Sequence, residues 1–62
     1  MRYMTTVEVA DLCRVAPETV RWWRYSNRGP RHLRIPGGRR VLYDVADVEA
    51  WLVTMKTDPN EP

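Results

Sequence analysis

Cys13 is the sole cysteine of a 62-residue chain, so no internal disulfide can hold the fold together. One cysteine and one histidine, His32, are also too few for a structural zinc site, which uses about four ligands. A chain this short has room for one small domain that buries roughly 60% of its unfolded surface. We expect this domain to span residues 1–56 and to be stabilised by packing alone. Residues 57–62 contain two prolines and no apolar residue, which predicts a disordered C-terminal tail.

The charges of the chain are unevenly distributed, although the formal net charge is only +2. Between Arg14 and Arg40 there are eight arginines and one acid, Glu18, which gives this window a charge of +7 and leaves −5 for the rest. Arginine binds phosphate and guanine edges through paired hydrogen bonds. The polarised charge therefore favours a polyanion on one side of the molecule. A solvated basic surface without a partner is the alternative interpretation.

Three stretches of the chain have the apolar spacing of short helices. The first follows Thr5 and Thr6, either of which can cap its N-terminus, and it carries Glu8 early and Arg14 late, as the helix dipole favours. Spacings of three and four residues predict one buried side. That side consists of Val9, Leu12, Cys13 and Ala16.

The second helix is predicted to begin at Pro17, because proline fits the first turn of a helix, where an N–H would have no partner. At about 100° per residue, Val20 and Trp23 share the buried side. The opposite side, flanked by Thr19 and Arg24, combines an acid, an arginine and two aromatic rings. This composition is typical of a helix that reads a DNA groove, whereas the competing interpretation buries both neighbouring tryptophans in the core. The residues of the outward side are Glu18, Arg21, Trp22 and Tyr25.

A short hairpin is predicted after Ser26–Pro30, where glycine and proline end the second helix. Arg31–Pro36 alternates polar and apolar residues, which predicts a half-buried strand with Leu33 and Ile35 directed inward. A Gly-Gly pair then supplies a tight turn, and Arg39–Tyr43 returns as the second strand. Because the proline before the turn limits pairing, we expect the hairpin to project as a wing. The wing carries Arg34, Gly38, Arg39 and Arg40.

Asp44 can cap a third helix that ends near Lys56. Its apolar residues recur at helical spacing, so this helix is expected to cover the core. They are Val45, Val48, Trp51, Leu52 and Met55.

This order of elements resembles the MerR-type winged helix-turn-helix domain as it occurs in small phage excisionases. Four ordered segments carry the resemblance and cover nearly residues 5–55. They are VEVADLCRVAPETVRWWR for the helix-turn-helix, RGPRHLRI for the turn and first wing strand, GGRRVLY for the tip and return strand, and DVADVEAWL for the closing helix. The resemblance implies a mainly α fold with a small β-hairpin (α+β), in the order helix-turn-helix, hairpin wing, helix.

The resemblance also gives each candidate residue a role on DNA. The helix that begins at Pro17 becomes the recognition helix. Its residues toward the major groove are Glu18, Thr19, Arg21, Trp22 and Tyr25, and its phosphate contacts are Arg24 and Arg28. The wing residues over the backbone or the adjacent minor groove are Arg34, Gly38, Arg39 and Arg40.

The function implied by the resemblance is that of a recombination directionality factor, with no chemistry and no cofactor, metal ion or small-molecule ligand. Such a protein binds direct repeats beside a phage attachment site, bends the DNA and helps a phage integrase to excise. Because one small monomer makes few contacts, we expect several copies to bind cooperatively, head to tail. The N-terminus lacks the features of a signal peptide, and no apolar run approaches the ~20 residues of a membrane span. We therefore expect a cytoplasmic protein, associated with the nucleoid of a bacterial host, without a membrane partner.

Two other functions stay open. The first is a stand-alone MerR-like transcriptional regulator with the same fold. The second is a protein-interaction module in which Trp22 and Tyr25 anchor a protein partner. An enzyme is not expected, because His32 stands among arginines and no nucleophile, carboxylate pair or set of metal ligands converges in the sequence.

Overall fold

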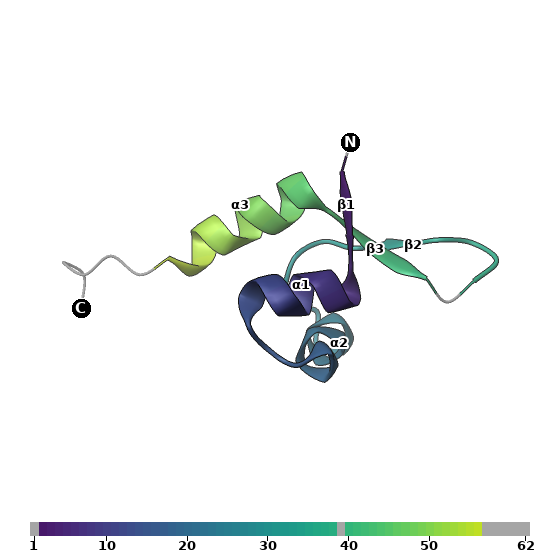
Figure 1. Cartoon of the computed structure of the whole chain (residues 1–62), viewed down its shortest axis with the longest axis horizontal. Coiled ribbons are helices and arrows are strands. Elements are labelled where there is room, and N and C mark those ends of the chain that lie inside the picture. The colour runs from purple at the N-terminus through teal and green to yellow at the C-terminus, as the bar shows by residue number, and fades with distance from the viewer. Residues whose placement is uncertain (1, 39, 57–62) are drawn as a thin grey trace.

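Three helices and a three-stranded antiparallel sheet make up the computed structural model, which describes residues 2–38 and 40–56 (Figure 1). The elements are β1 (Tyr3–Thr5), α1 (Thr6–Cys13), α2 (Pro17–Tyr25), β2 (Leu33–Arg34), β3 (Val41–Asp44) and α3 (Val45–Met55). The fold is the α+β winged helix-turn-helix predicted from the sequence. The expectations for Arg39 and for residues 57–62 lie outside the described residues.

The sheet contains a strand that the sequence did not reveal. β1 pairs with β3, with Met4 opposite Tyr43, and the strand order is β1-β3-β2. A strand of three residues is too short to show an alternating pattern, and its partner β3 follows only after both α1 and α2. β3 is therefore the central strand, and the wing grows out of a sheet that already includes the N-terminus.

The N-termini of α1 and α3 are capped by side chains that the sequence predicts as caps. Thr5 and Glu8 form a capping box on α1, because the Glu8 N–H donates to Thr5 Oγ1 (3.1 Å) and the Thr5 N–H donates to Glu8 Oε1 (2.9 Å). Asp44 caps α3 by accepting from the Ala46 N–H at 2.9 Å. The predicted caps are thus confirmed.

The turn between α1 and α2 is tight because Arg14 adopts a left-handed conformation, with φ 59°. The Val15 N–H reaches back to the Ala10 carbonyl at 3.0 Å, as in a common helix ending. α2 then starts at Pro17 without a side-chain cap on Ala16. This geometry lays α2 across α1, and the two helices pack closely together.

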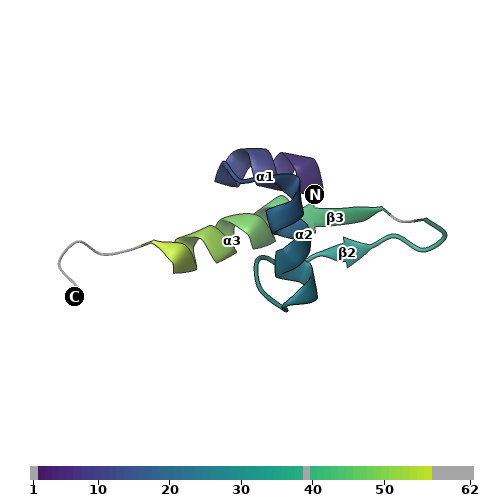
Figure 2. The same cartoon turned by 90° about the horizontal axis from the view of Figure 1, so that it is seen from below.

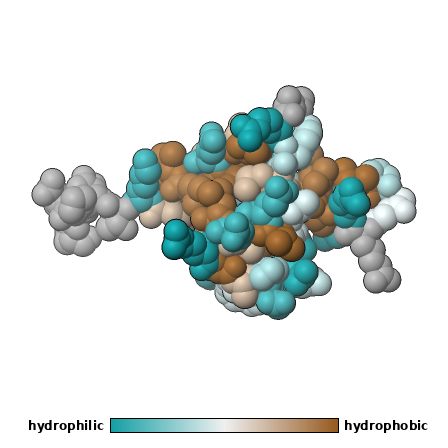
Figure 3. Space-filling model, in the orientation of Figure 1, coloured by the Kyte–Doolittle hydropathy of each residue, from teal (hydrophilic) through white to brown (hydrophobic). Residues whose placement is uncertain are grey.

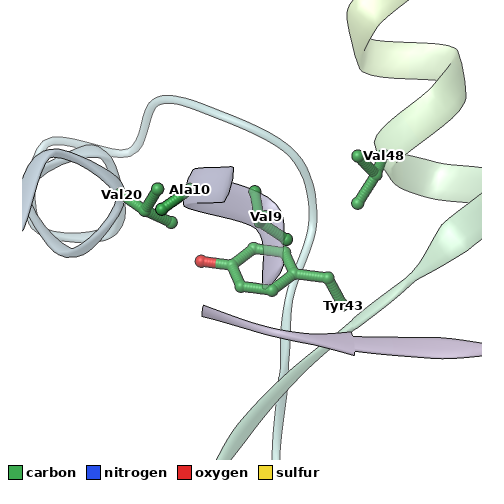
Figure 4. Close-up of a cluster of buried hydrophobic side chains, with 5 residues drawn as sticks. All are labelled: Val9, Ala10, Val20, Tyr43 and Val48. Carbon is green, nitrogen blue, oxygen red and sulfur yellow. The ribbon is translucent and has the colours of Figure 1, made fainter. Parts of the chain in front are cut away.

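The core lies where α1, α2, β3 and the first part of α3 meet (Figure 4). Tyr43 is its largest member, and its ring lies beside Val9 with its oxygen directed toward α2. Half-buried residues, among them Met4, Trp23 and Leu52, pack around this centre. The buried hydrophobic side chains of this core are Val9, Ala10, Val20, Tyr43 and Val48.

Several side chains predicted to be buried are exposed, and the local geometry explains most of these differences. α1 ends at Cys13, so Ala16 lies beyond its buried side and Ala10 takes that place. β2 is an edge strand, which leaves Leu33 and the Ile35 that follows the strand in solvent, and the end of α3 extends past the core (Figure 3). The exposed residues are Leu12, Ala16, Leu33, Ile35 and Met55.

Candidate functional site

The outward side of α2 is the largest group of exposed candidate residues. Val20 is buried against α1 and Trp23 is half-buried, so the helix rotates its other side into solvent. Trp22 is 55% exposed and Tyr25 86% exposed. The sequence prediction that one tryptophan faces in and its neighbour faces out is confirmed, and the competing interpretation with two buried tryptophans is wrong.

Two contacts organise this outward side. Arg21 Nη1 lies 3.6 Å from Glu18 Oε1, one turn away on the helix. Because both side chains are well exposed, this ion pair contributes little stability, and Arg21 is free to exchange its partner. The guanidinium of Arg28 lies over the Trp22 ring, a cation–π contact that links the helix to the turn after it.

The end of α2 explains how Arg28 comes to lie there. Asn27 and Gly29 both have positive φ (56° and 82°), and the Arg28 N–H donates to the Trp23 carbonyl at 2.7 Å. A Cβ on Gly29 would lie 3.1 Å from two carbons of Trp23, so this position requires glycine for its conformation and for its space. The turn therefore folds the chain back over α2.

Arg24 is separated from the other candidates of α2. Its Nη1 donates to the phenolic oxygen of Tyr43 at 2.9 Å and to Thr6 Oγ1 at 3.0 Å. The side chain is half-buried between α1, α2 and β3. Thr19, which we expected at the groove, is also half-buried.

The wing presents exposed basic residues on a short pair of strands. Arg34 lies opposite Val41 in the register of β2 and β3, and the Ile35 N–H donates to the Arg40 carbonyl at 3.1 Å. Gly37 has φ 82°, which makes the tight turn at the tip. Arg34, Gly38 and Arg40 are exposed, and Arg39 lies outside the described residues.

His32 lies at the base of the wing, with its ring 6.1 Å from that of Tyr43. Partial burial, followed by the charges of Arg24 and Arg34, lowers the pKa of His32 below its usual value of 6.5. His32 therefore favours its neutral form at pH 7 and leaves the positive charge of this region to the arginines.

α2 and the wing can be seen together from one side of the molecule. Figure 2, a view from below, shows α2 across the middle of the fold and the wing extending to one side of it. The structure thus brings together Glu18, Arg21, Trp22, Tyr25 and Arg28 on one surface and Arg34, Gly38 and Arg40 on a neighbouring one, while it directs Arg24 into the fold. Sequence reasoning did not find Tyr43 and Thr6 as partners of Arg24, because nothing in the spacing of three residues so far apart predicts a common contact.

Among the described residues, no three His, Cys, Asp or Glu side chains are grouped so that they could hold a metal ion. In the same part of the chain, every helix is too short or too polar to cross a bilayer.

Comparison with known proteins agrees with this geometry. A family model described as a helix-turn-helix domain matches residues 3–54, which run from β1 almost to the end of α3. No curated protein and no solved structure matches the chain.

Proposed function

Because the chain belongs to the helix-turn-helix domain family, whose members bind DNA, we propose that it is a sequence-specific double-stranded DNA-binding protein that acts as a phage excisionase. In this role it binds direct repeats beside an attachment site, bends the DNA and promotes integrase-mediated excision. The protein itself performs no chemistry and works in the cytoplasm of a bacterial host, on DNA.

The observation that carries this proposal is the exposed side of α2 beside an arginine-bearing wing. We assign α2 as the recognition helix, which enters the major groove and reads base edges through Arg21 and Glu18. Thr19, Trp22 and Tyr25 contact sugars, thymine methyl groups or backbone at the same groove. The proposed phosphate contacts outside α2 are Arg28, Arg34, Gly38, Arg39 and Arg40.

Bending follows from the use of two grooves by one small protein. A helix in one groove and a wing over the next neutralise phosphates on one face of the duplex, which favours curvature toward the protein. A bend of 40–90° costs on the order of 1–6 kcal/mol, which the contacts of the wing must offset.

Cooperative assembly follows from the small number of contacts that one copy can make. A head-to-tail contact repeats along the DNA with each direct repeat, whereas a two-fold contact would stop at a pair. We therefore propose that several copies fill adjacent repeats and that an integrase binds next to them.

The test is selection of binding sites from a random duplex library at about 150 mM salt, followed by footprinting with increasing protein. Tandem direct repeats that fill cooperatively, together with stimulated excision in a recombination assay with candidate integrases, are the expected result. A single inverted pair at promoters, with repression and no effect on recombination, would instead identify a stand-alone MerR-like regulator. No enrichment of any duplex would favour a protein-interaction module anchored by Trp22 and Tyr25, the two most exposed aromatic residues of α2.

A further inference from the structure

We propose that Arg24 is a positioning residue, whose guanidinium fixes the orientation of α2 relative to β3 and thereby sets the recognition helix and the wing at the angle at which both reach one duplex. This role takes the place of the phosphate contact that the sequence suggested for Arg24. Its effect on affinity rests on the proposed DNA-binding function, whereas its effect on helix orientation does not.

The contacts of Arg24 join three elements at one nitrogen. Nη1 donates to Tyr43 on β3 and to Thr6 at the start of α1, residues that lie 19 and 18 positions away in the chain. Tyr43 is 1% exposed, so its phenolic oxygen has no ready supply of water to replace this donor. A hydrogen bond from a charged donor in such surroundings is stronger and more directional than a neutral one.

The hydrogen bond between Arg24 and Tyr43 also involves the wing, because Tyr43 lies on the central strand of the sheet. β3 is the central strand, and Val41, two residues before Tyr43, pairs with Arg34 of the wing. α2 packs mainly on α1 rather than on the sheet. A link from the end of α2 to Tyr43 therefore connects the recognition helix to the strand from which the wing projects.

The charge of Arg24 also affects the pKa of a neighbouring side chain, His32. Among the causes of the lowered pKa of His32, the Arg24 charge ranks directly after partial burial and before the Arg34 charge. This influence agrees with a guanidinium that lies toward the base of the wing. A DNA phosphate at Nη1 would have to displace Tyr43 or Thr6 from that nitrogen.

The first experiment needs no DNA. Residual dipolar couplings of backbone amides report the orientation of α2 relative to β3 in the free protein. We expect two variants, Arg24→Met and Tyr43→Phe, to alter or average that orientation. Each removes the hydrogen bond from Arg24 Nη1 to the phenolic oxygen of Tyr43 with little change in side-chain shape. Val48→Ala, which weakens core packing on α3 but removes no hydrogen-bond partner of Arg24, is expected to retain that orientation. Unchanged couplings in both Arg24→Met and Tyr43→Phe would overturn the proposal, whether or not the protein binds DNA.

The second experiment measures affinity for the selected duplex over a range of salt, at a temperature at which circular dichroism shows every variant folded. Arg24→Met and Tyr43→Phe are each expected to weaken binding about tenfold, with an unchanged salt slope because the protein still neutralises the same phosphates. In the Arg24→Met background, the further weakening caused by Arg40→Ala should be smaller than in the native protein, because the wing is no longer held at the productive angle. Val48→Ala is expected to leave affinity unchanged.

The opposite pattern identifies the phosphate role and overturns the positioning role. In that case Arg24→Met reduces the salt slope by ~0.9 and Tyr43→Phe leaves affinity unchanged. Tyr43 is the informative variant, because its buried ring cannot itself reach DNA.

Discussion

The guanidinium carbon of Arg28 lies 5.7 Å from the centre of the Trp22 ring, so a residue of the turn is held against α2. The contact pre-orders a long side chain before any DNA is bound, which reduces the entropy that binding would otherwise cost. We therefore expect Trp22 to act in part by holding Arg28 in place.

Replacement of the Trp22 ring tests whether Trp22 acts by holding Arg28 in place. Trp22→Leu keeps apolar bulk but removes the aromatic face, and we expect it to weaken duplex binding by about two- to fivefold. In an Arg28→Ala background the same substitution should have a much smaller effect. Fluorescence anisotropy with a labelled duplex measures all four proteins, and an undiminished effect of Trp22→Leu would show that the ring contacts DNA independently of Arg28.

The wing is expected to supply affinity without sequence preference. Arg34→Ala combined with Arg40→Ala should weaken binding to every duplex and lower the log–log salt slope by ~0.9 for each phosphate that the wing no longer neutralises. Lys56→Ala removes a positive charge at the far end of α3 and serves as the control, with an unchanged slope expected. A wing variant that altered the preferred sequence instead would reverse the roles assigned to wing and helix.

Arg21 is expected to determine which sequence is chosen. Its exposed pair with Glu18 is weak, so the guanidinium can turn to a base edge, and removal of such a base contact costs about 1–3 kcal/mol at one position of the site. Selection from the random library with Arg21→Ala should therefore relax the preference at that position and leave the rest of the site intact. An unchanged selected sequence with uniformly lower affinity would assign Arg21 to a phosphate.

Gly29 is expected to be essential for stability rather than for DNA binding. Gly29→Ala places a methyl group 3.1 Å from Trp23 at a positive φ, and we expect it to lower the free energy of unfolding by about 1–3 kcal/mol. The matched control is Gly38→Ala, because the nearest atom to a Cβ there is the Arg40 nitrogen at 3.9 Å. Thermal unfolding followed by circular dichroism compares the two, and equal melting temperatures would contradict the proposed strain.

The stability of the protein is expected to depend on His32 below about pH 6.5. Its pKa is lower in the folded state than the usual 6.5, so the unfolded chain binds the proton first as the pH falls. The contribution of neutral His32 is therefore complete above pH 6.5 and is lost as the pH falls through the lowered value. Melting temperatures between about pH 7.5 and pH 5 should fall more steeply for the native protein than for His32→Gln, and parallel curves would refute the assignment.

Local features of the fold were predictable because the residues that cause them are adjacent in the sequence. Thr5 with Glu8, Pro17 and Asp44 mark the starts of the three helices where the structure has them. The spacing of Val20 and Trp23 likewise gave the correct side of α2 to the core.

Features that depend on distant partners were not predictable in this way. The pairing of β1 with β3 and the contact of Arg24 with Tyr43 join segments from separate parts of the chain. Periodicity also indicates which residues share a side but not how far a neighbouring element covers it, so Met55 and Leu33 were wrongly placed in the core.

The direct junction between β3 and α3 restricts where this chain can vary in length. Asp44 is at once the last residue of β3 and the cap of α3, so strand and helix join without a linker. An inserted residue at this junction would rotate α3 and withdraw Val48 from the core, whereas residues added near Gly37, at an exposed tip, would leave every other element in place. Natural variants of this chain are therefore expected to differ in length at the wing and to keep Tyr43, Asp44 and Val45 consecutive, without an insertion between β3 and α3.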